Sequence, residues 1–195
     1  MNLPNKLTVL RIILIPFVMF FYLANFIPFG IGKILALVIF IVAALTDLLD
    51  GQIARKHNIV TNLGKFLDPI ADKILTSTVL FMLMADGTIP APWGVIIVII
   101  IIAREFMVSA LRILAASKGT VLAADIWGKA KTMVQMIAIP VCMLIPILIE
   151  SAAFSWAILT VKIAGFVILG VATILTVISG INYLVKNKDC FKEDK

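Results

Sequence analysis

Long apolar stretches, separated by short polar breaks, run along almost the whole chain. Each stretch is close to the ~20 residues that an α-helix needs to cross the hydrocarbon core of a bilayer. Backbone polar groups in lipid must bond within their own segment, so helices are the expected structure. The pattern predicts an all-α, polytopic membrane protein, a single domain over residues 1–195 with six transmembrane helices, at residues 7–28, 34–56, 66–86, 93–116, 130–149 and 157–185.

Composition agrees with this pattern. The chain is 62% hydrophobic and 14% charged, whereas a soluble domain is about half apolar and about a quarter charged. The single histidine, His57, excludes a histidine-based catalytic triad and a His-rich metal site. Cys142 lies in an apolar run and Cys190 in the charged tail, so no disulfide framework is expected.

Basic residues gather at one set of segment ends, and only Lys33 and Lys162 fall toward the other. Because loops rich in Lys and Arg remain in the cytoplasm, both termini are predicted to be cytoplasmic. The net charge of +6 fits this topology and an attraction to anionic membrane lipids. No nucleic-acid-binding motif accompanies the charge, so no nucleic acid partner is expected. The compact chain without a targeting segment favours a bacterial cell membrane.

Four carboxylates break the apolar rule in the second and third segments, and ionisable groups at membrane depth cost several kcal/mol unless they are compensated. On a helix, Asp47 and Asp50 are about 60° apart, and Asp68 and Asp72 about 40° apart. A short loop joins the two segments, so their acidic faces can converge. Such a cluster needs a cation, and Mg²⁺, Mn²⁺ or Ca²⁺ suits ligation by oxygen alone. A structural polar network or a cation pathway, as in a transporter, is the alternative.

The acids belong to a longer pattern. The spacing Asp-x2-Asp-Gly-x2-Ala-Arg-x8-Gly-x3-Asp-x3-Asp resembles the signature of the CDP-alcohol phosphatidyltransferases. All eight fixed positions of that signature are present, at Asp47, Asp50, Gly51, Ala54, Arg55, Gly64, Asp68 and Asp72. The six-helix organisation of that family also fits the whole chain.

The resemblance implies roles for these residues. Asp47, Asp50 and Asp68 would hold Mg²⁺ or Mn²⁺, and Asp72 would be both a metal-site residue and the general base. The CDP part of CDP-diacylglycerol would bind at Gly51, Ala54, Arg55 and Gly64. The stretch from Pro4 to Arg11 resembles the family's nucleotide-contacting segment, which adds Asn5 and Thr8; the alternative is an ordinary polar helix start. The family also suggests a homodimer.

Cations in the fourth and fifth segments suggest a phosphate on the acceptor alcohol. They are Arg104, Arg112, Lys129 and Lys131. Ala103-Arg104-Glu105-Phe106 and Gly128-Lys129-Ala130-Lys131-Thr132, followed by Gln135, resemble family members whose acceptor is sn-glycerol 3-phosphate. Positive-inside topology alone is the alternative for the cations near the segment ends, and a structural ion pair is the alternative for Arg104 and Glu105. Glu105 is expected to pair with a cation elsewhere in the fold.

The expected reaction moves a phosphatidyl group from CDP-diacylglycerol to sn-glycerol 3-phosphate, releasing CMP. Because no Ser-His or Cys-His pair stands out, direct metal-assisted displacement is favoured over a covalent intermediate. Phosphatidylglycerol, inositol phosphate and serine remain as alternative acceptors.

Overall fold

The computed structural model describes residues 3–24, 26–27, 30–57, 62–117, 126–151 and 154–187. Within these ranges the chain is helical and contains no strand. The elements are α1 (Leu3–Leu23), α2 (Ile31–His57), α3 (Asn62–Ala85), α4 (Trp93–Ser117), α5 (Ile126–Glu150) and α6 (Ser155–Lys186). Each apolar segment of the sequence therefore corresponds to one helix, which confirms the all-α prediction.

Most helix ends lie within three residues of the prediction, but α1, α3 and α5 begin four residues before their predicted starts. The first helix ends at Leu23, five residues before the predicted end at residue 28. The chain turns there, because the backbone N–H of Ile27 donates to the carbonyl of Ala24 at 3.1 Å. Gly30, directly before α2, has a positive φ of 69°. Gly87, shortly after the end of α3, has a positive φ of 77°. Only glycine adopts such angles without strain, so both breaks are fixed by the sequence.

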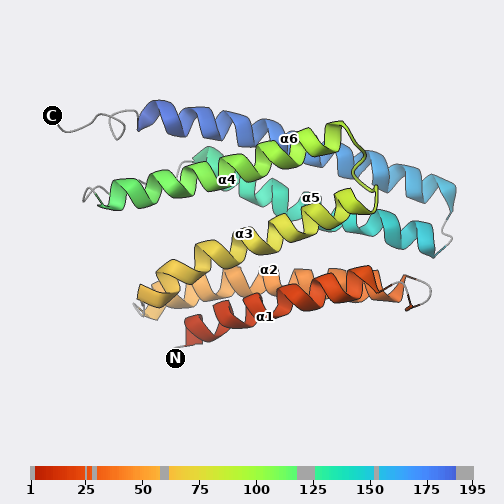
Figure 1. Cartoon of the computed structure of the whole chain (residues 1–195), viewed down its shortest axis with the longest axis horizontal. Coiled ribbons are helices and arrows are strands. Elements are labelled where there is room, and N and C mark those ends of the chain that lie inside the picture. The colour runs from red at the N-terminus through yellow and green to blue at the C-terminus, as the bar shows by residue number, and fades with distance from the viewer. Residues whose placement is uncertain are drawn as a thin grey trace.

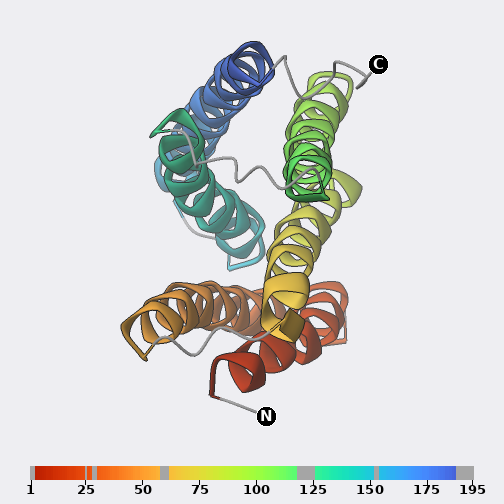
Figure 2. The ribbon, with the colours of Figure 1, turned by 90° about the vertical axis from the view of Figure 1, so that its left-hand side faces the viewer.

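Successive helices run antiparallel, and the N-terminal end of α1 and the C-terminal end of α6 lie at the same end of the bundle (Figure 1). The most extensive packing joins α1 to α2 and α5 to α6. Viewed along the bundle, α1 and α2 form the lower part and α4, α5 and α6 the upper part, with α3 between them (Figure 2). Among the described residues, α1 packs against α2 and α3 more than those two helices pack against each other.

The bundle divides into two halves of different chemistry. We call the half nearest the chain ends the termini half and the opposite one the far half. The main apolar core lies in the far half, where it includes Val18, Phe40, Leu83, Ile101 and Met143. All five of these side chains are no more than 1% exposed, so this half is held together by packing.

The buried side of α1 shows where the chemistry changes. Its buried positions follow one stripe along the helix, polar in the termini half and apolar in the far half: Asn5, Thr8, Arg11, Ile15, Val18 and Tyr22. Arg11 is fully buried, and its Nε donates to the carbonyl of Ala43 in α2 at 3.3 Å. Buried polar groups need hydrogen-bonding partners. The polar residues inside the termini half therefore mark a candidate ligand-binding region.

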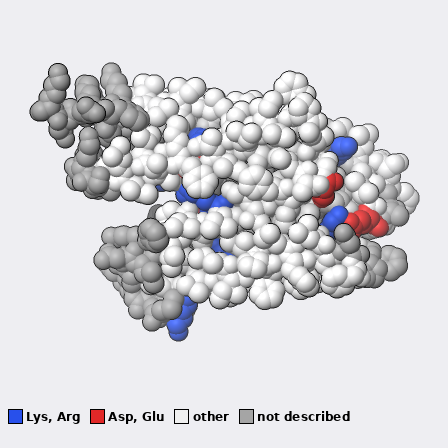
Figure 3. Space-filling view, viewed as in Figure 1, with Lys and Arg blue, Asp and Glu red and all other residues white. Residues whose placement is uncertain are grey.

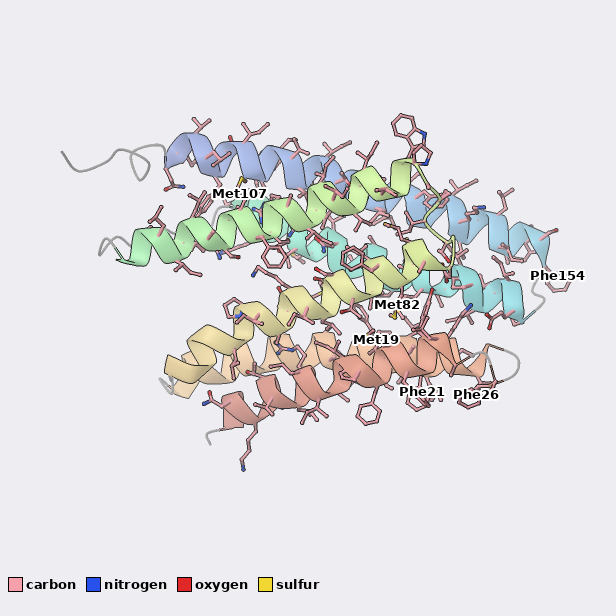
Figure 4. The ribbon with its side chains drawn as sticks, in the orientation of Figure 1. Met19, Phe21, Phe26, Met82, Met107 and Phe154 are labelled. Atoms are coloured by element: carbon pink, nitrogen blue, oxygen red, sulfur yellow. The ribbon has the colours of Figure 1, made fainter. Side chains whose placement is uncertain are left out.

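The outer surface of the bundle is strongly apolar. Phe26 and Phe154 point away from the bundle at the far end, whereas Met82 and Met107 lie among the helices (Figure 4). Among the described residues, α1, α4, α5 and α6 are long and apolar enough to cross a membrane. The described apolar part of α2 is Ile31–Thr46. These features are those of a membrane protein.

Two prolines lie inside α5, Pro140 and Pro146, between its two ends. Each lacks the N–H that would bond to the carbonyl four residues earlier in the helix.

Candidate active site

Asp72 lies at a small cavity between three helices in the termini half. The cavity has a volume of about 20 Å³ and is lined from α3, α4 and α5 by Asp72, Thr76, Glu105, Lys131, Thr132, Gln135 and Met136. This is room for about one water-sized group. The fold thus brings the predicted general base beside a predicted phosphate-binding cation, Lys131, although the two are far apart in sequence.

Lys131 is the most deeply buried lysine among the described residues, and it forms an ion pair with Glu105 of α4. The lysine side chain is 2% exposed and that of the glutamate 17%. A buried cation is tolerated only with such a partner, so the pair places the ammonium group at the cavity wall. The predicted pairing of Glu105 with a cation on another helix is confirmed.

Arg104 of α4 packs against residues of α5 and α6. Its Nη2 donates to Oγ of the fully buried Ser179 at 2.5 Å. A Cβ added at Gly180 would lie 3.2 Å from Cγ of Arg104, and one added at Gly128 would lie 3.5 Å from Nη2. A larger residue at position 180 would therefore have to displace the arginine stem slightly. The guanidinium group of Arg104 points toward the start of α5.

The remaining predicted cations are more accessible. The side chain of Lys129 is exposed. Arg112 is also exposed, and its guanidinium lies over the ring of Tyr183, 5.7 Å from the centroid. Basic atoms are visible in a hollow of the termini half, between the upper and lower helices (Figure 3).

A fifth cation was not assigned a role by the sequence. Lys73 follows Asp72 directly, and its Nζ donates to the carbonyl of Pro69 at 2.9 Å. The charge of Lys73 interacts with the charges of Asp72, Arg104 and Arg112. The charge of Lys131 interacts with those of Arg104 and Asp72. We call Lys73, Arg104, Arg112 and Lys131 the basic cluster. Its position beside Asp72 is suited to a ligand that carries both a phosphate and a hydroxyl group.

The sequence assigned no role to Thr76. Glu105, Thr132 and Gln135 stand in the stretches that resemble family members acting on sn-glycerol 3-phosphate, but their place at the cavity was not predicted. Thr76 lies one helical turn after Asp72, and its Oγ1 donates to the carbonyl of Asp72 at 3.1 Å. Helical spacing from an acidic residue was the signal that could have identified it. No comparable signal in the sequence joins Glu105 to Lys131, because their contact is between two helices.

For the other residues of the Asp-rich motif, the structure describes the backbone but not the side chains. Asp47, Asp50, Gly51, Ala54 and Arg55 lie in the last part of α2, and Gly64 and Asp68 in the first part of α3. Both regions belong to the termini half (Figure 1). Among the described residues, no three His, Cys, Asp or Glu side chains form a group able to hold a metal. The roles of these seven residues therefore stay predictions.

Asn5 and Thr8, the other predicted nucleotide contacts, are buried in the termini half, 6% and 1% exposed. Their burial shows that they are not solvent-facing residues of a helix start. Their contact with a nucleotide stays a prediction.

The sequence is similar to known proteins over nearly its whole length. Residues 1–178 match the family described as CDP-alcohol phosphatidyltransferase. The chain belongs to that family. It is 42% identical to the CDP-diacylglycerol–glycerol-3-phosphate 3-phosphatidyltransferase of Bacillus subtilis, with 98% of this chain and 97% of the relative covered.

Two further relatives carry the same name. The protein of Rickettsia felis is 37% identical, covering 97% of both chains. That of Haemophilus influenzae is also 37% identical, covering 94% of this chain and 91% of the relative. The match in each case extends over nearly the full length of both proteins, so it includes every helix that builds the cavity.

Proposed function

We propose that this chain is a phosphatidylglycerophosphate synthase, which transfers the phosphatidyl group of CDP-diacylglycerol to sn-glycerol 3-phosphate. The products are phosphatidylglycerol phosphate and CMP. The observation that carries the proposal is the meeting of Asp72 with a buried, paired lysine at one cavity. Membership of the family and the names of the relatives support the same reaction.

The acceptor binds by its phosphate. Arg104 and Lys131 are held in place by Ser179 and Glu105 before any ligand arrives. Such fixed cations bind a phosphate without first giving up side-chain freedom. Lys73, Arg112 and Lys129 add positive charge nearby, which steers an anionic acceptor to the site.

Asp72 then acts as the general base. It accepts the proton of the acceptor hydroxyl while that oxygen attacks the phosphorus atom that carries diacylglycerol. The new oxygen–phosphorus bond forms as the bond from that phosphorus to the bridging oxygen of CMP breaks, and CMP leaves with the bridging oxygen. Positioning and electrostatics supply most of the rate enhancement, as in other phosphoryl transfers.

A divalent metal fits the donor set of the motif. Asp47, Asp50, Asp68 and Asp72 offer only carboxylate oxygens, on two helices whose nearest ends lie in the same half of the bundle, and oxygen ligands suit Mg²⁺ or Mn²⁺. The ion would neutralise the charge of the donor pyrophosphate and of departing CMP. Residues Asn5, Thr8, Gly51, Ala54, Arg55 and Gly64 would hold the CDP group.

The proposal places the protein in a bacterial cell membrane as a homodimer with six spanning helices and both termini in the cytoplasm. The N-terminal end of α1 and the C-terminal end of α6 lie at the same end of the bundle, which supports an even number of membrane crossings (Figure 1). The charged motif residues of α2 and α3 would face the substrate rather than lipid, since ionisable groups are costly at membrane depth.

The decisive experiment measures CMP release by purified protein in detergent with CDP-diacylglycerol and Mg²⁺ or Mn²⁺. Acceptors to compare are glycerol 3-phosphate, glycerol, serine, inositol phosphate and phosphatidylglycerol. We expect release only with glycerol 3-phosphate, loss of release after chelation, and recovery when metal returns.

Asp72→Asn is the matched variant, because it keeps the shape of the side chain and removes the base. We expect it to reduce kcat about 100-fold or more while binding of the acceptor persists. Release with another acceptor would refute the assigned substrate but keep the family. A fully active Asp72→Asn enzyme would refute the assigned base.

A further inference from the structure

The cavity beside Asp72 contains an unsatisfied hydrogen-bond acceptor. The side chain of Gln135 is 4% exposed, and its Oε1 has no hydrogen-bond partner among the residues that the structure describes. Buried acceptors are nearly always bonded, because an unpaired one loses its hydration without replacement. Gln135 is one of the residues that line the cavity, so a group that enters the cavity can supply the missing donor.

The neighbouring hydroxyl groups do not serve it. Thr132, on the same helix, donates its Oγ1 hydrogen to the carbonyl of Gly128 at 2.9 Å. Thr76 donates its hydrogen to backbone carbonyls of α3. Each hydroxyl has only one hydrogen to donate, so these two cavity-lining residues are already committed.

The chemistry of the missing donor limits what the ligand group is. The cavity of about 20 Å³ has room for one hydroxyl group. An ionised phosphate offers only acceptors, so it cannot satisfy an amide oxygen. The ligand group at Gln135 is therefore a hydroxyl.

This step rests on the proposed function, in which glycerol 3-phosphate is the acceptor. The hydroxyl groups of that acceptor are the candidate donors. Glycerol 3-phosphate has two hydroxyl groups, and the attacking one gives its hydrogen to Asp72. The hydroxyl on the central carbon is the remaining donor. We propose that Gln135 accepts a hydrogen bond from this central hydroxyl and is thereby a specificity-determining residue, which makes the enzyme select a vicinal diol phosphate over a simple hydroxyalkyl phosphate.

The test compares two acceptors, glycerol 3-phosphate and 3-hydroxypropyl phosphate, which lacks only the central hydroxyl. With the wild-type enzyme we expect kcat/KM to be at least about tenfold higher for glycerol 3-phosphate, because the analogue leaves the amide oxygen unpaired. Gln135→Met keeps the length of the side chain and removes the acceptor. It should lower kcat/KM for glycerol 3-phosphate and bring the ratio of the two acceptors close to one.

Two controls separate recognition from folding. Thr173→Val removes a hydroxyl whose hydrogen bond is to the backbone of its own helix α6, and it should keep the wild-type ratio. Gln135→Asn keeps the amide on a shorter side chain and should give an intermediate ratio. If Gln135→Met fails to fold, the wild-type ratio and the Asn variant still decide the question.

The outcomes distinguish this inference from the proposed function. No release of CMP with glycerol 3-phosphate would contradict the proposed function itself. Activity with glycerol 3-phosphate but equal use of the deoxy analogue by the wild type would overturn the inference alone. So would a Gln135→Met enzyme that is slower with both acceptors by the same factor, since that is the mark of a purely structural residue.

Discussion

Helix α5 forms a lysine–glutamate ion pair at each of its ends, and the two pairs differ in their surroundings. Lys131, in the termini half, pairs with Glu105 of α4, and the side chains are 2% and 17% exposed. Glu150, in the far half, pairs with Lys33 of α2, and the exposures are 39% for the glutamate and 16% for the lysine. The same chemistry thus occurs once at a cavity and once near the surface.

The neighbours of the two pairs explain the difference. The far pair sits beside Gly30 and the ring of Tyr22, with the ammonium of Lys33 5.6 Å from the ring centroid. It joins α2 to α5 at the edge of an apolar core. The Lys131–Glu105 pair borders a cavity that is also lined by Asp72 and Gln135. Burial of charge next to further polar groups, rather than an ion pair as such, marks the functional half.

The largest expected effect comes from breaking the ion pair between Lys131 and Glu105. Lys131→Met should lower kcat/KM for glycerol 3-phosphate about 100-fold or more, because a fixed cation is lost from the phosphate site. It should also destabilise the protein, since Glu105 keeps a partly buried charge without its partner. Activity assays and thermal unfolding in detergent measure the two effects.

The double variant Lys131→Met with Glu105→Met separates these effects. We expect stability to recover, since no buried charge remains, while activity stays low. A double variant that regained activity would mean that the pair only supports the fold, and the contrast between the halves would fail.

A substitution in the far half should do the opposite. Phe40 is fully buried in the apolar core, so Phe40→Ala should lower the free energy of unfolding by about 3–5 kcal/mol. Turnover per folded molecule at low temperature should be unchanged. Phe17→Ala is the matched control, because that ring is 49% exposed and its loss should cost less. Equal losses from the two variants would argue against a core in the far half.

The smallest effect is expected at the far ion pair. Lys33→Met should lower the free energy of unfolding by about 1 kcal/mol or less, because Glu150 remains accessible to water. Added salt should reduce the difference from wild type by screening the pair. Acceptor kinetics should not change; a rise in KM for glycerol 3-phosphate would show that the far half contributes to the site.

Much of this could be predicted from the sequence, and the failures have physical causes. Apolar length is a local property, so all six helices were located. The starts of α1, α3 and α5 were predicted four residues too late, and the end of α1 was missed because the chain turns before the predicted break at residues 28–30. Asp72, Arg104 and Lys131 were identified because charge is costly within apolar segments. A cation partner for Glu105 was also expected, but its identity as Lys131 and the contact of Arg104 with Ser179 were not, because both are contacts between helices. The metal and CDP roles of the Asp motif remain predictions.

The two prolines of α5 have a mechanical consequence. They lie between the two anchored ends of the helix, and each removes one backbone hydrogen bond, so bending stiffness is lowest in that stretch. When an acceptor larger than the present cavity enters, the strain of widening should be taken up there. The segment before Pro140 would then tilt as a short rigid rod, while the end carrying Glu150 keeps its place, so entry of substrate need not disturb the apolar base of the bundle.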